Sequence, residues 1–238
     1  MCRSATRSPC ATAPSFSLFK RSQPQRMQVK AKRVLYCTGN TGKFGEGSQS
    51  IAAVWPELEV VQREPSVVEV QGSAHDIARA KVASARAELA RHEHLDKHDV
   101  VLAEDVSLEL DSLGGFPGPY VKPMLEAISD SGLASLAQRL DSQHCTARCT
   151  VGVAPVSPGV SANDNNSSDV LVFSGSLRGQ IIDECRGSVK HGNASWNACF
   201  VPDGMEKTFG ELSWSKQSVI SHRFKALKQM CDHLFPPR

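Results

Sequence analysis

Two carboxylates, Glu104 and Asp105, directly follow an apolar run over residues 100–103 and precede a turn rich in glycine and proline over residues 114–120. An acidic pair at the end of a buried strand projects into a crevice, where it can hold a divalent metal or a polarised water. The chain also carries three basic groups, in a glycine-bearing loop, on a predicted helix and after the turn: Lys43, Lys81 and Lys122. Carboxylates for a metal and lysines for phosphates together indicate nucleotide hydrolysis.

The glycine-bearing loop, TGNTGK over residues 38–43, lies between a short apolar run and the start of a helix. It is not a P-loop, because its glycines are too closely spaced and Phe44 stands where a metal-binding hydroxyl is needed. A strand-to-helix loop with two glycines can still present backbone N–H groups to an anion, aided by the helix N-terminus. An ordinary tight turn is the alternative.

The elements that position these residues alternate along the chain. Apolar runs predict strands at 34–37, 60–61, 67–70, 100–103, 146–154 and 170–182. Helical periodicity and composition predict helices at 48–54, 73–91, from Pro123, at 133–140 and at 220–234. The segment 67–70 is expected to pair with 60–61, and residues 107–111 to extend the strand at 100–103 or to form a hairpin arm. This interleaving predicts an α/β fold with a mixed sheet.

Length and charge restrict the partners. With 238 residues the chain can bury a real core, as one large domain or two lobes. Residues 1–33 hold eight of the 27 basic residues and no acidic one, so the body has 19 basic against 25 acidic residues and a charge of −6. A body of that sign is a poor general binder of nucleic acid. No apolar run approaches the roughly 20 residues that cross a membrane. A small-molecule partner is therefore expected.

The N-terminal segment is rich in serine and arginine and contains no acidic residue. This composition is typical of an organellar transit peptide, and a disordered extension is the alternative. We therefore predict a disordered or targeting extension over residues 1–32 and one domain over 33–238. Eight irregularly spaced cysteines indicate reduced thiols in an intracellular protein. The expected location is the cytoplasm, with organellar import through the basic segment as the alternative.

Five motifs in order carry a resemblance to a known family. They are TGNTGKFGE from Thr38, EVQG from Glu69, LAEDVSLELDSLGGFPGPYVK from Leu102, FVPDGMEKTFGEL from Phe200 and SHRFKAL from Ser221. In this order and spacing the chain resembles the inosine triphosphate pyrophosphatases, from about Val34 to the C-terminus. The resemblance implies an elongated two-lobed α/β fold, with a central mixed sheet flanked by helices and the active site in the cleft between the lobes. It also implies a homodimer that uses Mg²⁺, or Mn²⁺, to split ITP, dITP or XTP into the monophosphate and pyrophosphate.

The resemblance also implies roles for individual residues. The metal ligands would be Glu69 and Asp105, and the catalytic residues Asp105, Lys43 and Glu104. The triphosphate would contact Thr38, Gly39, Asn40, Thr41, Gly42, Lys43 and Lys81. The other substrate-binding positions would be Asp105, Val106, Lys122, Ala194, Ser195, Trp196, Asn197, Gln217, His222 and Arg223. Glu69 could instead face solvent, Lys81 could be an exposed helix lysine, and His222 could be a capping or core histidine. Trp214 is interpreted as a packing or lobe-covering residue.

The base-binding positions depart from the family pattern. Ala194 stands where the family usually has an aromatic residue that stacks on the purine, and alanine cannot stack. Asn197 replaces an aspartate and so lacks the charge that pairs with an arginine. Trp196 is retained and could take over as the platform. An altered base preference in the same reaction is therefore the alternative to hydrolysis of ITP, dITP and XTP.

Two departures lie closer to the phosphates. Gln217 stands where the family commonly has lysine, with Lys216 one step earlier, and Val106 replaces a hydroxyl residue after Asp105. A nucleotide-binding protein that no longer hydrolyses is a third reading. The retained carboxylates and lysines argue against it.

Overall fold

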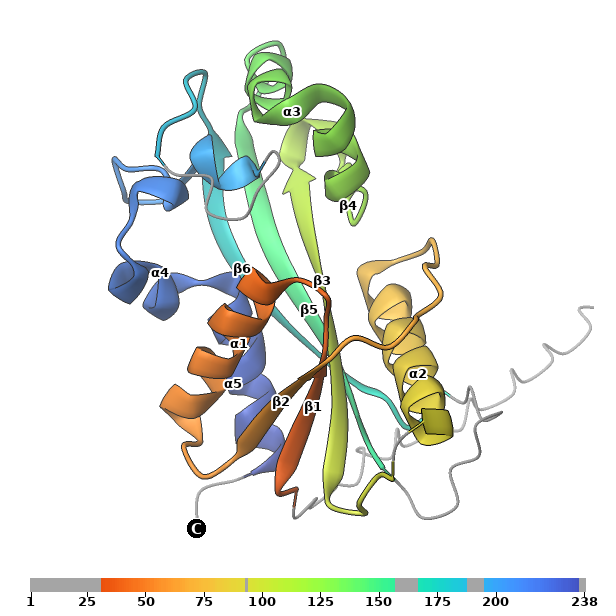
Figure 1. Cartoon of the computed structure of the whole chain (residues 1–238). Coiled ribbons are helices and arrows are strands. Elements are labelled where there is room, and N and C mark those ends of the chain that lie inside the picture. Colours follow the sequence, from red (N-terminus) through yellow and green to blue (C-terminus); the bar gives the residue numbers. More distant parts are fainter. Residues whose placement is uncertain (1–30, 93, 157–166, 188–194, 236–238) are drawn as a thin grey trace, which may run out of the picture.

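The computed structural model describes residues 31–92, 94–156, 167–187 and 195–235 (Figure 1). Its strands are β1 (Arg33–Cys37), β2 (Glu59–Arg63), β3 (Asp99–Leu110), β4 (Pro117–Gly118), β5 (His144–Pro155), β6 (Leu171–Ile181) and β7 (Phe200–Pro202). Its α-helices are α1 (Thr41–Val54), α2 (Ala74–His92), α3 (Val121–Ala137), α4 (Trp214–Ile220) and α5 (His222–Leu234). Three short 3-10 helices complete the described elements: η1 (Asp111–Leu113), η2 (Trp196–Ala198) and η3 (Phe209–Glu211).

The strands form one mixed sheet in the order β2-β1-β3-β5-β6-β7, with β4 also paired to β3. The β1 strand is parallel to both β2 and β3, whereas β3, β5, β6 and β7 pair antiparallel. The long strands β3, β5 and β6 run from the lower half of the molecule into the upper half (Figure 1). The prediction of an α/β fold with a mixed sheet is confirmed.

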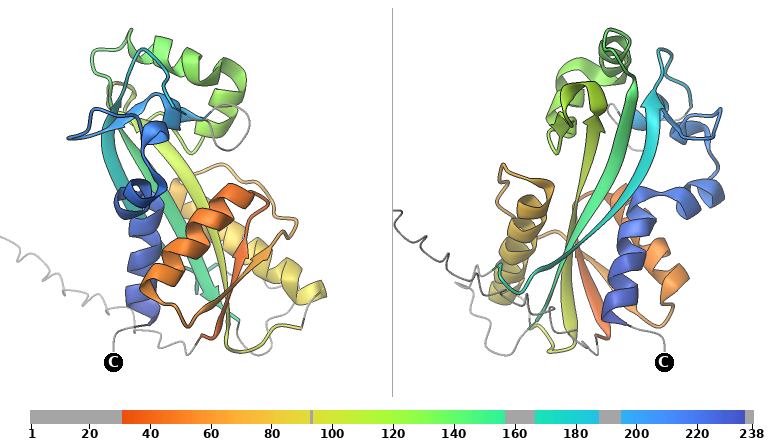
Figure 2. Two further views of the ribbon diagram at one scale, coloured as in Figure 1. Left: turned by 60° about the vertical axis from the view of Figure 1, so that its left-hand side comes forward. Right: turned by 180° about the vertical axis from the view of Figure 1, so that it is seen from behind.

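Helices cover both faces of the lower half of the sheet. Seen from behind, α2 lies on one side, and α1 and α5 lie on the other (Figure 2). Side chains that alternate along a strand enter different layers. Tyr36 and Leu102 pack under α1 and α5, whereas Leu35 and Val101 pack under α2. A third core, which includes Leu133, fills the upper half beneath α3. The two halves therefore have separate cores joined by continuous strands.

The start of α5 is fixed by close packing on β6. Ser221 caps the helix by accepting a hydrogen bond from the backbone N–H of Arg223. A Cβ atom on Gly175 would lie 2.2 Å from the carbonyl oxygen of His222. Only glycine permits this approach, so β6 sets the position of His222 and Arg223.

Two expectations about the elements need correction, and one of two alternatives is confirmed. Residues 67–70 are not a strand, and β2 pairs with β1 instead. Of the alternatives for residues 107–111, an extension of the preceding strand is confirmed, because 107–110 continue β3 without a break. The helix expected from residue 48 begins at Thr41, because the Asn40 cap stabilises its glycine-containing first turns. The helices expected near 123 and 133 are both present in α3, separated by a kink at Ser129.

Two other expectations concern the chain as a whole. The extension over residues 1–32 lies almost entirely outside the described residues, and β1 begins at Arg33. No helix in the described ranges combines the length and apolarity that a membrane crossing needs.

Candidate active site

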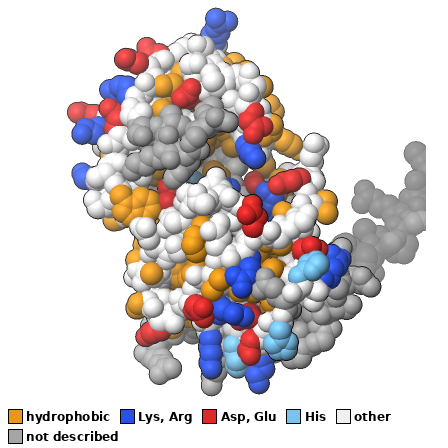
Figure 3. Space-filling view, viewed as in Figure 1, with side chains coloured by type: hydrophobic (Ala, Val, Ile, Leu, Met, Phe, Trp, Pro, Cys, Tyr) orange, Lys and Arg blue, Asp and Glu red, His pale blue; other side chains and the backbone are white. Residues whose placement is uncertain are grey.

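The edge of β3 has a gap in the middle of the sheet. Its pairing with β1 ends where Tyr36 meets Leu102, and its pairing with β4 begins at Leu108. Over the described residues, positions 103–107 of β3 therefore have no strand on this side. Glu104 and Asp105 lie in this gap, between the two halves of the molecule. Charged side chains of both signs gather on the surface where the halves meet (Figure 3).

The loop after β1 brings a helix N-terminus to the gap. The Asn40 side chain accepts a hydrogen bond from the backbone N–H of Lys43 at 3.0 Å and so caps α1. The Thr38 hydroxyl accepts from the backbone N–H of Asn40 at 3.1 Å. The Gln62 amide of β2 donates to the Thr38 carbonyl at 2.8 Å. The predicted phosphate loop, which also contains Gly39, Thr41 and Gly42, thus has a defined conformation with the positive end of the α1 dipole beside it.

Glu104 points toward α1 and α5 and is buried. Its carboxylate accepts a hydrogen bond from the Tyr36 hydroxyl at 2.7 Å. The Nε–H of Arg223 donates to the same carboxylate, at 3.0 Å from Oε1 and 2.9 Å from Oε2. The Lys43 ammonium lies 3.8 Å from the same carboxylate. Arg223 also donates to the carboxylate of Glu46 on α1. Glu104 therefore holds Arg223 in place.

Asp105 points to the other face of the sheet, because successive residues of a strand alternate. The Lys81 ammonium of α2 donates to its Oδ1 at 2.8 Å and lies 3.4 Å from a carboxylate oxygen of Glu69. Oδ2 of Asp105 is buried and has no hydrogen-bond partner within the described residues. The expectation that the acidic pair projects together into one crevice needs correction. The two carboxylates flank the open edge of β3 from opposite faces.

Burial and charge shift the protonation of these groups. Burial raises the pKa of Glu104 above its ordinary value, although the Lys43 charge and the Tyr36 hydrogen bond oppose the rise. Burial also raises the pKa of Tyr36, so its hydroxyl remains a donor. Burial of Lys81 acts against its charge, but Asp105 and Glu69 together raise its pKa above the usual value. Lys81 is therefore positively charged at neutral pH.

His222 is buried in an aromatic cluster. Its ring lies 5.5 Å from the centroid of Trp196 and 6.3 Å from that of Phe209. Its Nδ1 atom has no hydrogen-bond partner within the described residues. Burial lowers the pKa of His222 to about 3, with the charges of Lys43 and Lys225 acting in the same direction. The imidazole is therefore neutral under ordinary conditions.

The buried imidazole predicts a pH-dependent stability. The folded-state pKa lies below the unfolded value of 6.5, so the unfolded state binds the proton more strongly and stability falls as the pH drops from 6.5 toward 3. Between pH 7.5 and 5, we expect the free energy of unfolding of the wild type to fall by roughly 2 kcal/mol more than that of His222→Phe. Urea unfolding of both proteins at the two pH values measures this difference. Equal losses in the two proteins would contradict the assigned neutral, buried state.

Three further residues that were predicted to bind substrate do not all lie at the gap. Lys122 is not brought into the charged cluster, because its side chain is 84% exposed and pairs with Glu126 on α3. Val106 packs between the upper core and the α1–α5 core. Trp196 is 6% exposed among Phe200, Phe209 and His222, and this packing leaves little of its ring open to a base.

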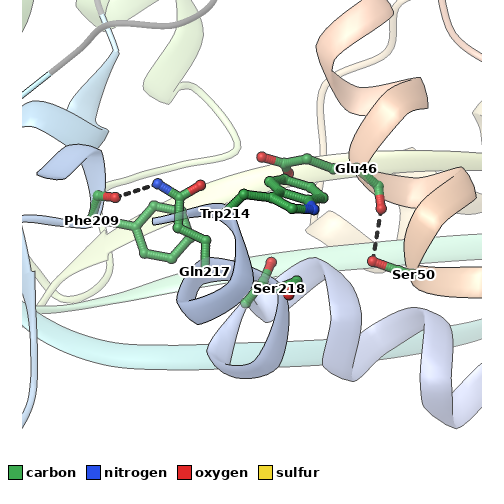
Figure 4. Close-up of a pocket in the computed structure, with 7 residues that line it drawn as sticks. Glu46, Ser50, Phe209, Trp214, Gln217 and Ser218 are labelled. Carbon is green, nitrogen blue, oxygen red and sulfur yellow. Dashed lines mark hydrogen bonds between the residues drawn. The ribbon is translucent and has the colours of Figure 1, made fainter. Parts of the chain in front are cut away.

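The other positions predicted to contact the base differ in their hydrogen bonds. The Ser195 side chain accepts a hydrogen bond from the backbone N–H of Asn197 and caps η2. Ala194 lies outside the described residues. Gln217 is buried, and its amide donates to the carbonyl of Phe209 at 2.6 Å (Figure 4) and to that of Leu212 at 3.1 Å. Gln217 therefore fixes the backbone around η3 and α4.

Sequence reasoning missed two residues that the geometry brings to the site. Tyr36 donates to Glu104, and Glu46 pairs with Arg223. Glu46 follows Lys43 by three positions, which places both on one side of α1, so helical spacing could have revealed it. No sequence pattern singled out Tyr36, because it lies within an apolar run that is typical of a buried strand.

Comparison with known proteins gives consistent results. A model of the Ham1 family matches residues 34–233. An inosine triphosphate pyrophosphatase from Yarrowia lipolytica is 32% identical over 197 residues, which cover 83% of this chain and 93% of that protein. A HAM1 protein from Coxiella burnetii has a similar structure, with a TM-score of 0.64, 19% identity, and coverage of 83% of this chain and 95% of that one. The structure of a nucleoside-triphosphatase, or dITP/XTP pyrophosphatase, from Mycobacterium abscessus is also similar, with a TM-score of 0.55 and 22% identity. The match covers 86% of this chain and 100% of that one.

Proposed function

The chain belongs to the Ham1 family, and on that premise we propose that it hydrolyses the non-standard purine nucleotides ITP, dITP and XTP to the monophosphate and pyrophosphate. It is then a hydrolase acting on acid anhydrides that cleans the nucleotide pool. The gap in the edge of β3 carries this proposal. The α1 N-terminus and Lys43 lie on one side of it, and Lys81 and Asp105 lie on the other. Positive groups for a polyphosphate thus meet a carboxylate with a free oxygen.

The residues present fit a Mg²⁺ or Mn²⁺ ion. Asp105 and Glu69 both approach the Lys81 ammonium, so two carboxylates already surround one cationic position. The unpartnered Oδ2 of Asp105 supplies an oxygen ligand of the kind these ions prefer. No set of three or more metal-ligating side chains occurs in the described part of the chain, but Mg²⁺ usually takes one or two carboxylates and completes its shell with phosphate and water. A bound ion would polarise the phosphoryl oxygens.

The protein groups have separable tasks in this proposal. A triphosphate is strongly anionic, so its charge must be neutralised before water can approach. Lys43, Lys81 and the α1 N-terminus supply that neutralisation and stabilise the leaving pyrophosphate. Attack of water on the phosphorus next to the ribose would release pyrophosphate. Where it is not engaged by the ion, Oδ2 of Asp105 can take the proton of this water.

A panel of nucleotides tests the proposal. Purified protein with Mg²⁺ is incubated with ITP, dITP, XTP, GTP, ATP and UTP, and pyrophosphate and orthophosphate are measured separately. We expect pyrophosphate as the first product, with the 6-oxopurines preferred over ATP. Orthophosphate as the first product would refute the assignment. Pyrophosphate release with another base preferred would favour the alternative of altered base preference. Tight binding without turnover would favour the non-hydrolysing alternative.

The assembly and the location are also proposals. The resemblance supports a homodimer whose partner is a small nucleotide. The cysteine pattern supports a cytoplasmic protein, and the negative charge of the body argues against a nucleic-acid partner. Light scattering during size-exclusion chromatography measures the oligomeric state. A fluorescent fusion of residues 1–33 tests import into an organelle.

A further inference from the structure

The loop at the start of α1 presents free hydrogen-bond donors. The Asn40 side chain accepts from the backbone N–H of Lys43, whereas the N–H groups of Thr41 and Gly42 have no partner within the described residues. The first turn of α1 contains no acidic side chain. Outward N–H groups and the positive end of a helix dipole stabilise an anion. In the proposed function this anion is the triphosphate.

A carboxylate that follows β2 lies against the same loop. Glu64 comes directly after β2, and a Cβ atom on Gly39 would lie 2.2 Å from its Oε1 and 3.0 Å from its Cδ. Two hydrogen bonds join the end of β2 to the loop. The backbone N–H of Thr38 donates to the Arg63 carbonyl at 2.9 Å, and the Gln62 amide donates to the Thr38 carbonyl at 2.8 Å. The Glu64 carboxylate is therefore in contact with the backbone of Gly39.

The charge of Glu64 is not neutralised in the way that the other carboxylates near the loop are. Asp105 pairs with Lys81, and Glu104 pairs with Arg223. Within the described part of the chain, no cation lies at ion-pair distance from Glu64. Its side chain is also exposed, so substitution disturbs no core packing. The negative charge of Glu64 therefore acts directly on the loop.

The charges of Glu64 and of a phosphate at this loop oppose each other. The start of α1 stabilises either anion through the same dipole. Like unit charges a few ångströms apart weaken each other's binding severalfold even in water, and more where protein displaces the water. Because Glu64 is exposed, its side chain can turn into solvent when a phosphate contacts the loop. Pyrophosphate has no base or ribose to anchor it, so its binding depends entirely on such phosphate contacts.

We propose that the Glu64 carboxylate competes with phosphate for the loop at the start of α1 and thereby weakens the retention of pyrophosphate. The inference rests on the proposed function, because it concerns the loop that would hold the triphosphate. Glu64 is then the anion at the loop in the free protein, and a nucleotide displaces it. After hydrolysis, its return helps the pyrophosphate to leave. Glu64 tunes affinity in this way and takes no part in the chemical step.

Binding of inorganic pyrophosphate, measured by isothermal titration calorimetry, tests the proposal. Glu64→Gln keeps the shape of the side chain without its charge and should lower the Kd about 3- to 10-fold. The gain should shrink at about 0.5 M KCl, because salt screens exposed charges. Glu59→Gln is the matched control, since it makes the same change of charge at the other end of β2 and should leave the Kd within about twofold. An equal or higher Kd in Glu64→Gln, an equal gain in Glu59→Gln, or no binding by either the wild type or Glu64→Gln would overturn the proposal.

Steady-state kinetics separate this inference from the proposed function. With ITP as substrate, Glu64→Gln should strengthen product inhibition by pyrophosphate by the same factor, and its KM should fall. If the wild type hydrolyses no triphosphate, the proposed function fails, and the calorimetric titration still decides the role of Glu64. If the wild type releases pyrophosphate from ITP but Glu64→Gln binds pyrophosphate no more tightly, only the inference fails.

Discussion

Asp105→Asn is expected to reduce kcat for ITP by roughly 10³-fold or more while the protein stays folded. The substitution removes the negative charge of a carboxylate that lies in the β3 gap and has a buried oxygen without a partner in the described ranges. An amide cannot accept a proton from water and is a weak ligand for Mg²⁺. The amide oxygen can still accept the hydrogen bond from Lys81, so little stability should be lost. Pyrophosphate release and the melting temperature measure the two effects.

Asp111→Asn provides a matched control for this prediction. Asp111 is also an ion-paired aspartate close to β3, but it pairs with Arg178 on the exposed surface of the upper half. Its substitution should leave kcat within about twofold, because surface pairs contribute little. The assignment of Asp105 fails if Asp105→Asn retains more than a tenth of the wild-type kcat. A similar loss in Asp111→Asn would show that the effect is not specific to the gap.

The sequence predicted the class of fold because its strongest patterns are local. Apolar runs and helical periodicity located the long strands, α2 and α5 within a few residues. The strand predicted at 67–70 is absent: its valines are compatible with a strand, but the backbone N–H of Val68 donates to the Ser84 hydroxyl of α2. Helix α1 was predicted too short because the glycine content lowered its propensity, whereas the cap at Asn40 decides where it begins.

The sequence indicated which residue types gather at the candidate site but not how their side chains are arranged. Residue types correctly brought Lys43, Lys81 and the acidic pair to one region of β3. The strand was predicted to end at residue 103, so the alternation that sends Glu104 and Asp105 to opposite faces was not applied to them; β3 in fact continues to Leu110. Lys122 was included because it follows the turn, but its helix directs it to solvent. Gln217 of α4 was predicted to bind substrate, but it is buried and its amide donates to the carbonyls of Phe209 and Leu212, because which face of a seven-residue helix is exposed depends on tertiary packing.

Arg223→Leu is expected to destabilise the fold by about 3–5 kcal/mol, the cost of leaving a buried charge without its partner. Arg223 is 8% exposed and lies between two carboxylates, Glu104 and Glu46, of which Glu104 is 1% exposed. Its removal leaves both acids in a site with too few donors. Glu104→Gln should cost less, because the amide oxygen can still accept from Tyr36 and Arg223, and Glu46 still pairs with the guanidinium. Chemical unfolding at pH 8 measures both variants.

The same pair gives a second, sharper test through the double variant and pH. Combining Glu104→Gln with Arg223→Leu removes the stranded charge, so the double variant should be more stable than Arg223→Leu alone. Burial raises the pKa of Glu104, so without Arg223 the carboxyl should take up a proton as the pH falls from 8 toward 5. The folded state then binds the proton more strongly than the unfolded state, and the deficit of Arg223→Leu should shrink at low pH. Arg148→Leu, which breaks a more exposed pair with Glu109, should cost only about 1 kcal/mol at either pH. If Arg223→Leu behaved like Arg148→Leu, the buried pair could not be what holds Arg223 in place.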